Sequence, residues 1–227
     1  YASISTSFQP TAETDFFGGA FKPLTATQYE AGIKYQPTWI NASLTAAVFD
    51  IRQQNTPSGD PNPAHPFARV QLGEVSVRGF DIEARAQLTE GLGLIASYAF
   101  LDHEITKSSI ATDIGKRLPS TPMHQGSLWA DYTIQAGALA GLGIGGGVRF
   151  VGSTYDTANT VRIPSYTLVD ASLSYDLGKA FPALNGAKLS VVAKNLFDRY
   201  YVSQCGNVPG CTLGSRRSVQ ATLTYRW

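Results

Sequence analysis

The chain ends in Arg217-Ser218-Val219-Gln220-Ala221-Thr222-Leu223-Thr224-Tyr225-Arg226-Trp227, where apolar and polar residues alternate. From Val219 onwards every second residue is apolar, and each residue between them is polar or charged. Because successive side chains of a β-strand point to opposite faces, this segment has one apolar and one polar face. An apolar face that ends on a terminal aromatic ring is typical of the last strand of an outer-membrane β-barrel, where the ring lies at the lipid–water interface.

The same alternation recurs along most of the chain. It predicts strands over residues 29–36, 44–48, 80–88, 92–100, 128–135, 142–150 and 166–177. Residues 1–8 are predicted to be the end of an earlier strand. Together with the last strand and the one expected before it, the pattern predicts an all-β, antiparallel transmembrane barrel segment of about ten strands.

The predicted connections alternate between short and long. Short ones fall near residues 37–41, 89–91, 136–141 and 179–187, and longer polar ones near 9–26, 54–66, 106–121, 153–162 and 203–215. Bacterial barrels have short periplasmic turns and long external loops. We therefore expect the long loops to lie outside the cell and the last strand to run inward.

Aromatic residues on the apolar faces support this orientation. Tyrosines fall near the expected periplasmic ends of four strands, at Tyr35, Tyr132, Tyr175 and Tyr225. Other rings fall near the expected outer ends, at Tyr98, Phe100 and Phe150. Two aromatic belts are expected of a membrane barrel. A soluble β-sandwich also has alternating strands, but it does not need rings collected at the strand ends.

The composition excludes several other classes of protein. Charged residues make up 15% of the 227-residue chain and the net charge is +1, so we expect no nucleic-acid partner. No stretch approaches the ~18 consecutive apolar residues that a membrane helix needs. The chain begins at Tyr1 without a signal peptide, which a secreted barrel requires. We therefore expect residues 1–227 to be the C-terminal barrel segment of a longer polypeptide.

Cys205 and Cys211 flank a short segment that contains Gly, Pro and Asn. A local disulfide is expected in an oxidising compartment, and so short a loop would gain roughly 2 kcal/mol from it. His65, His103 and His124 are scattered, with no His-x-x-x-His or Glu-x-x-His spacing, so neither a metal site nor a cofactor is expected.

Several motifs resemble one family of barrels. Asn195-Leu196-Phe197-Asp198-Arg199-Tyr200-Tyr201 is similar to the penultimate strand of TonB-dependent outer-membrane receptors, and Arg78-Gly79-Phe80-Asp81-Ile82-Glu83-Ala84 is similar to another of their strands. The runs 127–132 and 145–149 resemble the ferric-siderophore branch, particularly ferrichrome-type receptors. The cysteine pair in the last external loop also matches that branch.

The resemblance implies a barrel of about 22 strands, plugged by an N-terminal globular domain. Such a receptor binds a ferric siderophore from outside and releases it inward when TonB acts on the plug. This chain would supply the last ten or so strands, without the plug or a TonB-contacting segment. The partners implied are the ferric siderophore, the plug, TonB through the plug, outer-membrane lipid and lipopolysaccharide.

Exposed rings in the external loops are the candidate ligand contacts, because hydroxamate siderophores are bulky and partly apolar. They are Phe16, Phe17 and Phe21 in the first long loop and Tyr155 in the fourth. The alternative is that these rings pack on neighbouring loops or on the missing part of the barrel. The cysteine loop contains Val208 and Leu213 but no aromatic residue, which weakens its candidacy.

No catalytic motif is present in the sequence, so we do not expect an enzyme. Asp102 and His103 are adjacent in a predicted strand and point to opposite faces, so they cannot form a dyad. The strand charges are expected to line the wet interior, at Asp81, Glu83, Arg85, Asp131, Asp170 and Arg226. The alternative to a receptor is a small closed barrel that acts as a passive pore or a membrane-embedded hydrolase.

Overall fold

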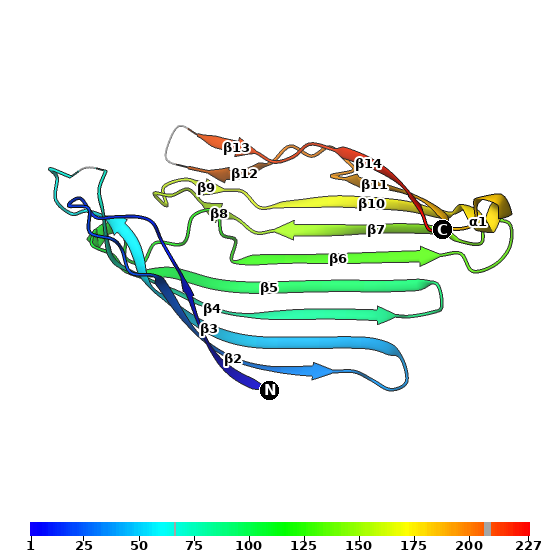
Figure 1. Cartoon of the computed structure of the whole chain (residues 1–227), viewed down its shortest axis with the longest axis horizontal. Helices are drawn as coiled ribbons and strands as arrows, with labels where there is room; N and C mark the ends of the chain where they lie inside the picture. Colours follow the sequence, from blue (N-terminus) through cyan, green and yellow to red (C-terminus); the bar gives the residue numbers. More distant parts are fainter. Residues whose placement is uncertain (66, 207–209) are drawn as a thin grey trace.

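A computed structural model describes residues 1–65, 67–206 and 210–227. In this part of the chain ten strands form one antiparallel sheet, in which the strand order follows the chain order (Figure 1). The strands are β1 (Ala2–Gln9), β2 (Leu24–Tyr35), β3 (Asn41–Gly59), β4 (Arg69–Gln87), β5 (Leu92–Lys107), β6 (His124–Thr133), β7 (Leu142–Val151), β10 (Tyr166–Asp176), β11 (Ala187–Lys194) and β14 (Ser218–Tyr225). Pro66 and Val208 lie outside the described residues.

The remaining elements are short and lie in the connections. Two hairpins pair β8 (Thr154–Tyr155) with β9 (Arg162–Ile163), and β12 (Val202–Cys205) with β13 (Cys211–Leu213). The helical turns are η1 (Ala111–Asp113), α1 (Leu177–Ala180) and η2 (Pro182–Leu184). Within the described ranges, no helix is long and apolar enough to cross a membrane.

The connections divide between the two ends of the sheet. The long ones gather at one end, on the left in Figure 1, and the short ones at the other. We call these the long-loop end and the short-turn end. The expected alternation of short and long connections is confirmed. The sheet is open, with β1 and β14 as its edges, so the described residues form a segment of a barrel wall and not a small closed barrel.

The predicted strands are confirmed, but several of their limits differ: β6 ends at Thr133 and not at residue 135, and β4 ends at Gln87 and not at residue 88. The loop expected from Gln54 begins later, because β3 continues to Gly59. Leu177 is the first residue of α1 and does not belong to the preceding strand. The run Asn195–Tyr201 is not the penultimate strand but the turn that follows it: β11 ends at Lys194, and Asn195 and Asp198 have positive φ angles of 51° and 56°.

The register of the sheet separates an apolar face from a polar face. Val48 lies opposite Phe80, and Phe80 lies opposite Phe100, so rows of apolar side chains run across the strands. Val48 is exposed and Phe80 and Phe100 are partly exposed, which is costly in water and favourable in lipid. The other face carries the charges expected in the interior of the barrel, at Asp81, Glu83, Arg85, Asp131 and Asp170.

Polarity reverses towards the long-loop end of β3, β4 and β5. Next to the apolar row, the lipid-side face continues with Asp50 opposite Arg78, and Arg78 opposite Asp102. On the other face Ile51 lies opposite Val77. A strand leaving the bilayer turns its polar side chains outward and its apolar ones under the loops. The reversal therefore marks the edge of the lipid-facing band, and the Phe80 and Phe100 rings lie at this edge with centroids 5.7 Å apart.

Gly79 is required by close backbone packing at the same level of the sheet. A Cβ atom there would lie 2.0 Å from the carbonyl oxygen of Phe100 and 3.0 Å from the ring of Phe49. We expect Gly79→Ala to lower the free energy of unfolding by about 1–2 kcal/mol, measured by thermal or urea unfolding in detergent. Gly146→Ala is the control, because its Cβ atom would meet only the Asp170 carbonyl oxygen, at 3.8 Å. Equal stability of the two variants would contradict this steric explanation.

Candidate functional site

The first two long loops bring aromatic rings together at the long-loop end. The Phe16 ring stacks on the His65 imidazole with centroids 3.5 Å apart and planes 13° apart. The Phe17 ring meets Phe16 edge-on at 5.3 Å and lies 5.8 Å from His65. We call Phe16, Phe17 and His65 the aromatic cluster. Phe17 is 85% exposed and Phe16 is also exposed, so the cluster offers apolar surface to a ligand.

The His65 ring is held in place from its own loop. Its Nδ1 atom lies 2.9 Å from Oδ2 of Asp60, and the other Asp60 oxygen accepts the Asn62 N–H at 2.9 Å. The Asn62 N–H bond, followed by the His65 bond, lowers the pKa of Asp60. Asp60 therefore stays ionised at neutral pH and fixes the ring on which Phe16 stacks.

Further contacts tie the first loop to β4. The Lys22 N–H donates to the Gln71 side chain at 2.7 Å, and Arg69 lies 3.5 Å from Glu13. The Asp15 carboxylate accepts the Phe17 N–H at 2.9 Å and so closes the turn that presents both rings. The loop that carries Phe16 and Phe17 is therefore positioned by its neighbours.

Only two of the four predicted ligand contacts come together. Phe21 lies in the same loop, where its N–H donates to the Glu13 carbonyl, but its ring is not among the described contacts of the cluster. Tyr155 lies in β8, in a different loop, and makes no described ring contact with Phe16 or Phe17. His65 joins the cluster, although it is not one of the predicted ligand contacts.

The loop between β5 and β6 is closed around His103, which is almost fully buried. The Leu118 N–H donates to Nδ1 at 3.0 Å, so Nε2 carries the hydrogen and donates to the Thr121 carbonyl at 3.1 Å. Burial is the main cause that lowers the pKa of His103. Asp102 lies on the opposite face, 3.3 Å from Arg117. The prediction that Asp102 and His103 cannot form a dyad is confirmed.

The same loop is joined to the loop that carries Tyr155. The Asn159 side chain accepts the Arg117 N–H at 2.8 Å and donates to the Arg117 carbonyl at 3.0 Å. The Ser120 N–H donates to the Tyr155 carbonyl at 2.9 Å. Asp156 is buried and accepts the Val161 N–H at 2.8 Å, which is the main cause that lowers its pKa. These bonds make Tyr155 part of a fixed loop framework.

The last long connection contains the two cysteines. Cys205 and Cys211 form the expected disulfide, with an S–S distance of 2.02 Å, and they close the β12–β13 hairpin. β12 lies against β8 and β9, so this hairpin borders the Tyr155 loop (Figure 1). Leu213, one of the two apolar residues noted in the cysteine loop, lies on β13 and its side chain is exposed.

The turn after β11 anchors the start of this connection. Buried Asn195 accepts the Arg199 N–H at 2.8 Å and donates to the carbonyls of Arg199 and Ser215 at 2.9 and 3.1 Å. Asp198 accepts hydrogen bonds from the Arg216 side chain and, at 2.9 Å, from the Arg217 N–H. The Arg216 bond, followed by the Arg217 bond, lowers the pKa of Asp198 strongly. The motif therefore joins the two ends of the loop.

Within the described ranges, no group of three or more His, Cys, Asp or Glu side chains could hold a metal ion. The architecture is that of an outer-membrane barrel wall, with interlocked long loops at one end and exposed aromatic rings among them. These features define the wall of an outer-membrane β-barrel protein.

Comparison with known proteins identifies the family. The family described as "TonB dependent receptor-like, beta-barrel" matches residues 1–196. The chain belongs to this family of TonB-dependent receptors, as its motifs predicted.

The two curated relatives compared next are about three times as long as this chain. The chain is 40% identical over 228 residues to the ferrichrome outer membrane transporter/phage receptor of Escherichia coli K12, covering all of this chain and 30% of that protein. It is 37% identical over 226 residues to the ferrioxamine B receptor of Salmonella typhimurium, covering 99% of this chain and 31% of that protein. The chain thus spans about a third of the length of these relatives.

Solved structures show the same fold. The siderophore receptor PiuA from Acinetobacter baumannii has a TM-score of 0.76 and 26% identity, over 99% of this chain and 33% of that chain. The ferric yersiniabactin uptake receptor FyuA from Yersinia pestis has a TM-score of 0.79 and 21% identity, over 99% of this chain and 34% of that chain, and supports the fold alone. The predicted type of barrel is confirmed.

Proposed function

We propose that this chain is part of an outer-membrane receptor that imports ferric siderophores, of the hydroxamate type exemplified by ferrichrome. Its long loops lie outside the cell, and TonB energises transport through a plug supplied by the rest of the protein. The two curated relatives named for ferrichrome and ferrioxamine B support the type of cargo. The ferric siderophore is the transported substrate, and no resident cofactor is proposed.

The aromatic cluster is the single observation that carries the proposed binding role. Phe16 and Phe17 are exposed although hydrogen bonds hold their loop in a defined conformation. The loop therefore keeps both rings at the surface, where a ligand can contact them. Large exposed apolar surfaces mark binding sites, and a bulky siderophore offers apolar surface to cover. We assign Tyr155 and Phe21 to the same binding face, as secondary contacts.

The polar face of the sheet supports a plugged lumen. Arg85 pairs with Glu83 at 2.7 Å, and Arg149 pairs with Asp170 across β7 and β10. Charges that face the interior of a barrel contact water or an inserted domain. We assign these pairs to the surface that meets the plug.

The experiment is a titration of the purified full-length receptor with ferrichrome, followed by intrinsic fluorescence. Replacing both Phe16 and Phe17 with alanine should weaken binding about tenfold or more, because two desolvated aromatic contacts are lost. Phe181→Ala at the short-turn end, where the ring is also exposed, is the matched control and should bind normally. Saturable binding that is unchanged in the double variant would remove the cluster from the site. No binding by the parent receptor would contradict the choice of ferrichrome.

A further inference from the structure

Residues 117–121, in the loop between β5 and β6, lie between two partners, and we call this segment the strap. On one side the strap binds His103: the Leu118 N–H donates to Nδ1 at 3.0 Å, and Nε2 donates to the Thr121 carbonyl at 3.1 Å. On its other side the backbone of the strap binds the loop between β8 and β9. Contacts to the two partners alternate along the strap, so both depend on the conformation of the same short segment.

Three hydrogen bonds join the strap to the β8–β9 loop. The Asn159 side chain accepts the Arg117 N–H at 2.8 Å and donates to the Arg117 carbonyl at 3.0 Å. The Ser120 N–H donates to the Tyr155 carbonyl at 2.9 Å. Two of the three bonds therefore depend on one side chain, that of Asn159, which can be removed without changing the strap itself.

The β8–β9 loop is also closed on itself. The buried Asp156 carboxylate accepts the N–H groups of Thr160 and Val161 at 2.7 and 2.8 Å and the Thr160 hydroxyl at 3.1 Å. The Val161 bond is the main cause that lowers the pKa of Asp156, so this carboxylate stays ionised in mild acid. A loss of the strap bonds would therefore free the loop as a unit and leave its internal bonds in place.

The two ends of the strap are held by the backbone of β5. Before the strap, the Gly115 N–H donates to the Ile105 carbonyl and the Ile105 N–H donates to the Lys116 carbonyl, each at 2.9 Å. Beyond it, the Leu101 N–H donates to the Met123 carbonyl at 2.8 Å. The segment that can move when His103 releases it is thus limited to residues 117–122.

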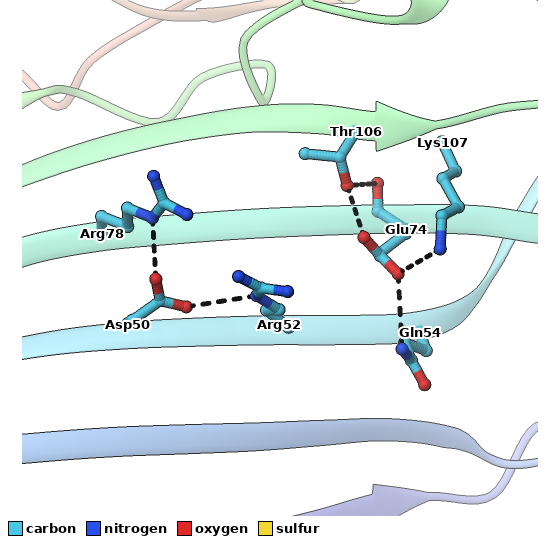
Figure 2. Close-up of polar contacts among 7 residues, drawn as sticks. All are labelled: Asp50, Arg52, Gln54, Glu74, Arg78, Thr106 and Lys107. Atoms are coloured by element: carbon cyan, nitrogen blue, oxygen red, sulfur yellow. Dashed lines mark hydrogen bonds and ion pairs between the residues drawn. The ribbon is translucent and has the colours of Figure 1, made fainter.

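The outer end of β5 is in turn fixed to β4 through Glu74. This carboxylate accepts the Thr106 hydroxyl at 2.9 Å, the Lys107 ammonium at 2.8 Å and the Gln54 amide at 3.3 Å (Figure 2). The Lys107 bond is the main cause that lowers the pKa of Glu74, so the joint between the strands also stays ionised in mild acid. The strand that carries His103 therefore keeps its position when the strap moves.

His103 is the titratable group at the centre of these contacts, and it is almost fully buried. Arg117 on the strap lowers its pKa and Asp102 on β5 raises it, while β4 places the uncharged Val77 opposite. Glu104, the other neighbour on β5, points to the opposite face. A neutral imidazole serves the strap because one nitrogen accepts and the other donates. A protonated ring has two donors, so a strap N–H would face another donor in a buried site.

We propose that the strap is a pH-dependent latch between two long loops. Neutral His103 holds the strap against β5, the strap holds the β8–β9 loop, and a proton on Nδ1 releases both together. The aromatic cluster lies outside this latch, because Asp60 can accept a hydrogen bond from His65 whether that ring is neutral or protonated. Acid therefore loosens the loops around Tyr155 and leaves the loops around Phe16 in place.

The test compares the full-length receptor in detergent at pH 8 and pH 5. Hydrogen exchange at the Leu118 and Ser120 amides, corrected for the intrinsic pH dependence, should become faster together by about fivefold or more at pH 5. The Phe21 amide, which donates to a backbone carbonyl in the first long loop, is the internal control and should not change.

Spin labels measure the release of the β8–β9 loop separately. They are attached at Ala158→Cys in that loop and Ala183→Cys at the short-turn end, both exposed positions. The distance distribution between the labels should be narrow at pH 8 and broad at pH 5, because the loop loses the strap as its support.

Two variants separate the parts of the latch. His103→Gln should abolish both responses to acid, because the glutamine amide offers an acceptor and a donor but does not titrate. Asn159→Ala should broaden the label distances already at pH 8, while exchange at Leu118 stays sensitive to acid. Thr157→Ala, an exposed position in the same loop, is the matched control and should behave like the parent.

Three outcomes would overturn the proposal. They are faster exchange in the strap at pH 5 with unchanged label distances, loop motion in acid that persists in His103→Gln, and no response to acid in either measurement. Both measurements are made without a ligand. An effect of the latch on ligand contact by Tyr155 rests on the proposed function, and ferrichrome titration of the same samples at both pH values reports on it independently.

Discussion

Asn195→Ala is expected to lower the local opening free energy of the last long loop by about 4 kcal/mol. The Asn195 side chain is almost fully buried and satisfies the Arg199 N–H and the carbonyls of Arg199 and Ser215. Each buried backbone group left without a partner costs about 1–3 kcal/mol. The positive φ of 51° adds a cost of about 1 kcal/mol for alanine, which asparagine tolerates better.

Hydrogen exchange of the amides in residues 195–217 measures this opening free energy, with the Arg199 amide as the direct reporter. Asn195→Gly separates the two causes, because glycine accepts the positive φ but loses the same hydrogen bonds. It should therefore recover about 1 kcal/mol and no more. Asn185→Ala, in an exposed turn at the other end of the sheet, should leave exchange in this segment unchanged. Unchanged protection of the Arg199 amide in Asn195→Ala would refute the anchoring role of this turn.

The strands could be predicted from sequence because lipid imposes a strict rule on each of them. Where a strand crosses the bilayer, every second residue must be apolar, and Val48, Phe80 and Phe100 follow that rule. Beyond the bilayer the period of two continues but the polarity reverses, as at Asp50 and Arg78. The extension of β3 to Gly59 was therefore missed, because a search for apolar alternation ends where the lipid ends.

The site was predictable only where the signal is local. A six-residue separation was enough to predict the Cys205–Cys211 disulfide, and adjacency was enough to place Asp102 and His103 on opposite faces. The stacking of Phe16 on His65 joins two loops and depends on how β2, β3 and β4 set their ends side by side. A histidine in a long proline-containing loop was the only sequence signal for it. The Asn195 turn was mistaken for a strand because the hydrogen bonds that define it reach as far as Ser215.

His103 is expected to make the β5–β6 loop sensitive to acid. Burial, and next the nearby Arg117 cation, lower its pKa, while the Thr121 carbonyl and Asp102 oppose that shift. The folded chain therefore takes up a proton at lower pH than the unfolded chain, whose histidine titrates near 6.5. Its contribution to stability is fully present above about pH 6.5 and is lost as the pH falls below that value towards the folded pKa. Protonation would also remove the acceptor of the Leu118 N–H.

Hydrogen exchange of residues 108–123 between pH 8 and pH 5, corrected for the intrinsic pH dependence of exchange, tests this directly. The opening free energy should fall below about pH 6.5 with a slope of up to about 1.4 kcal/mol per pH unit, the limit for one proton. His103→Gln should remove that slope, whereas His65→Gln and His124→Gln, the other two histidines, should retain it. His103→Leu should cost about 3 kcal/mol at pH 8, because the Leu118 N–H and the Thr121 carbonyl lose their partner. A slope that survives in His103→Gln would assign the acid sensitivity to another group, because a loop closed on neutral imidazole cannot keep its pH dependence once that imidazole is gone.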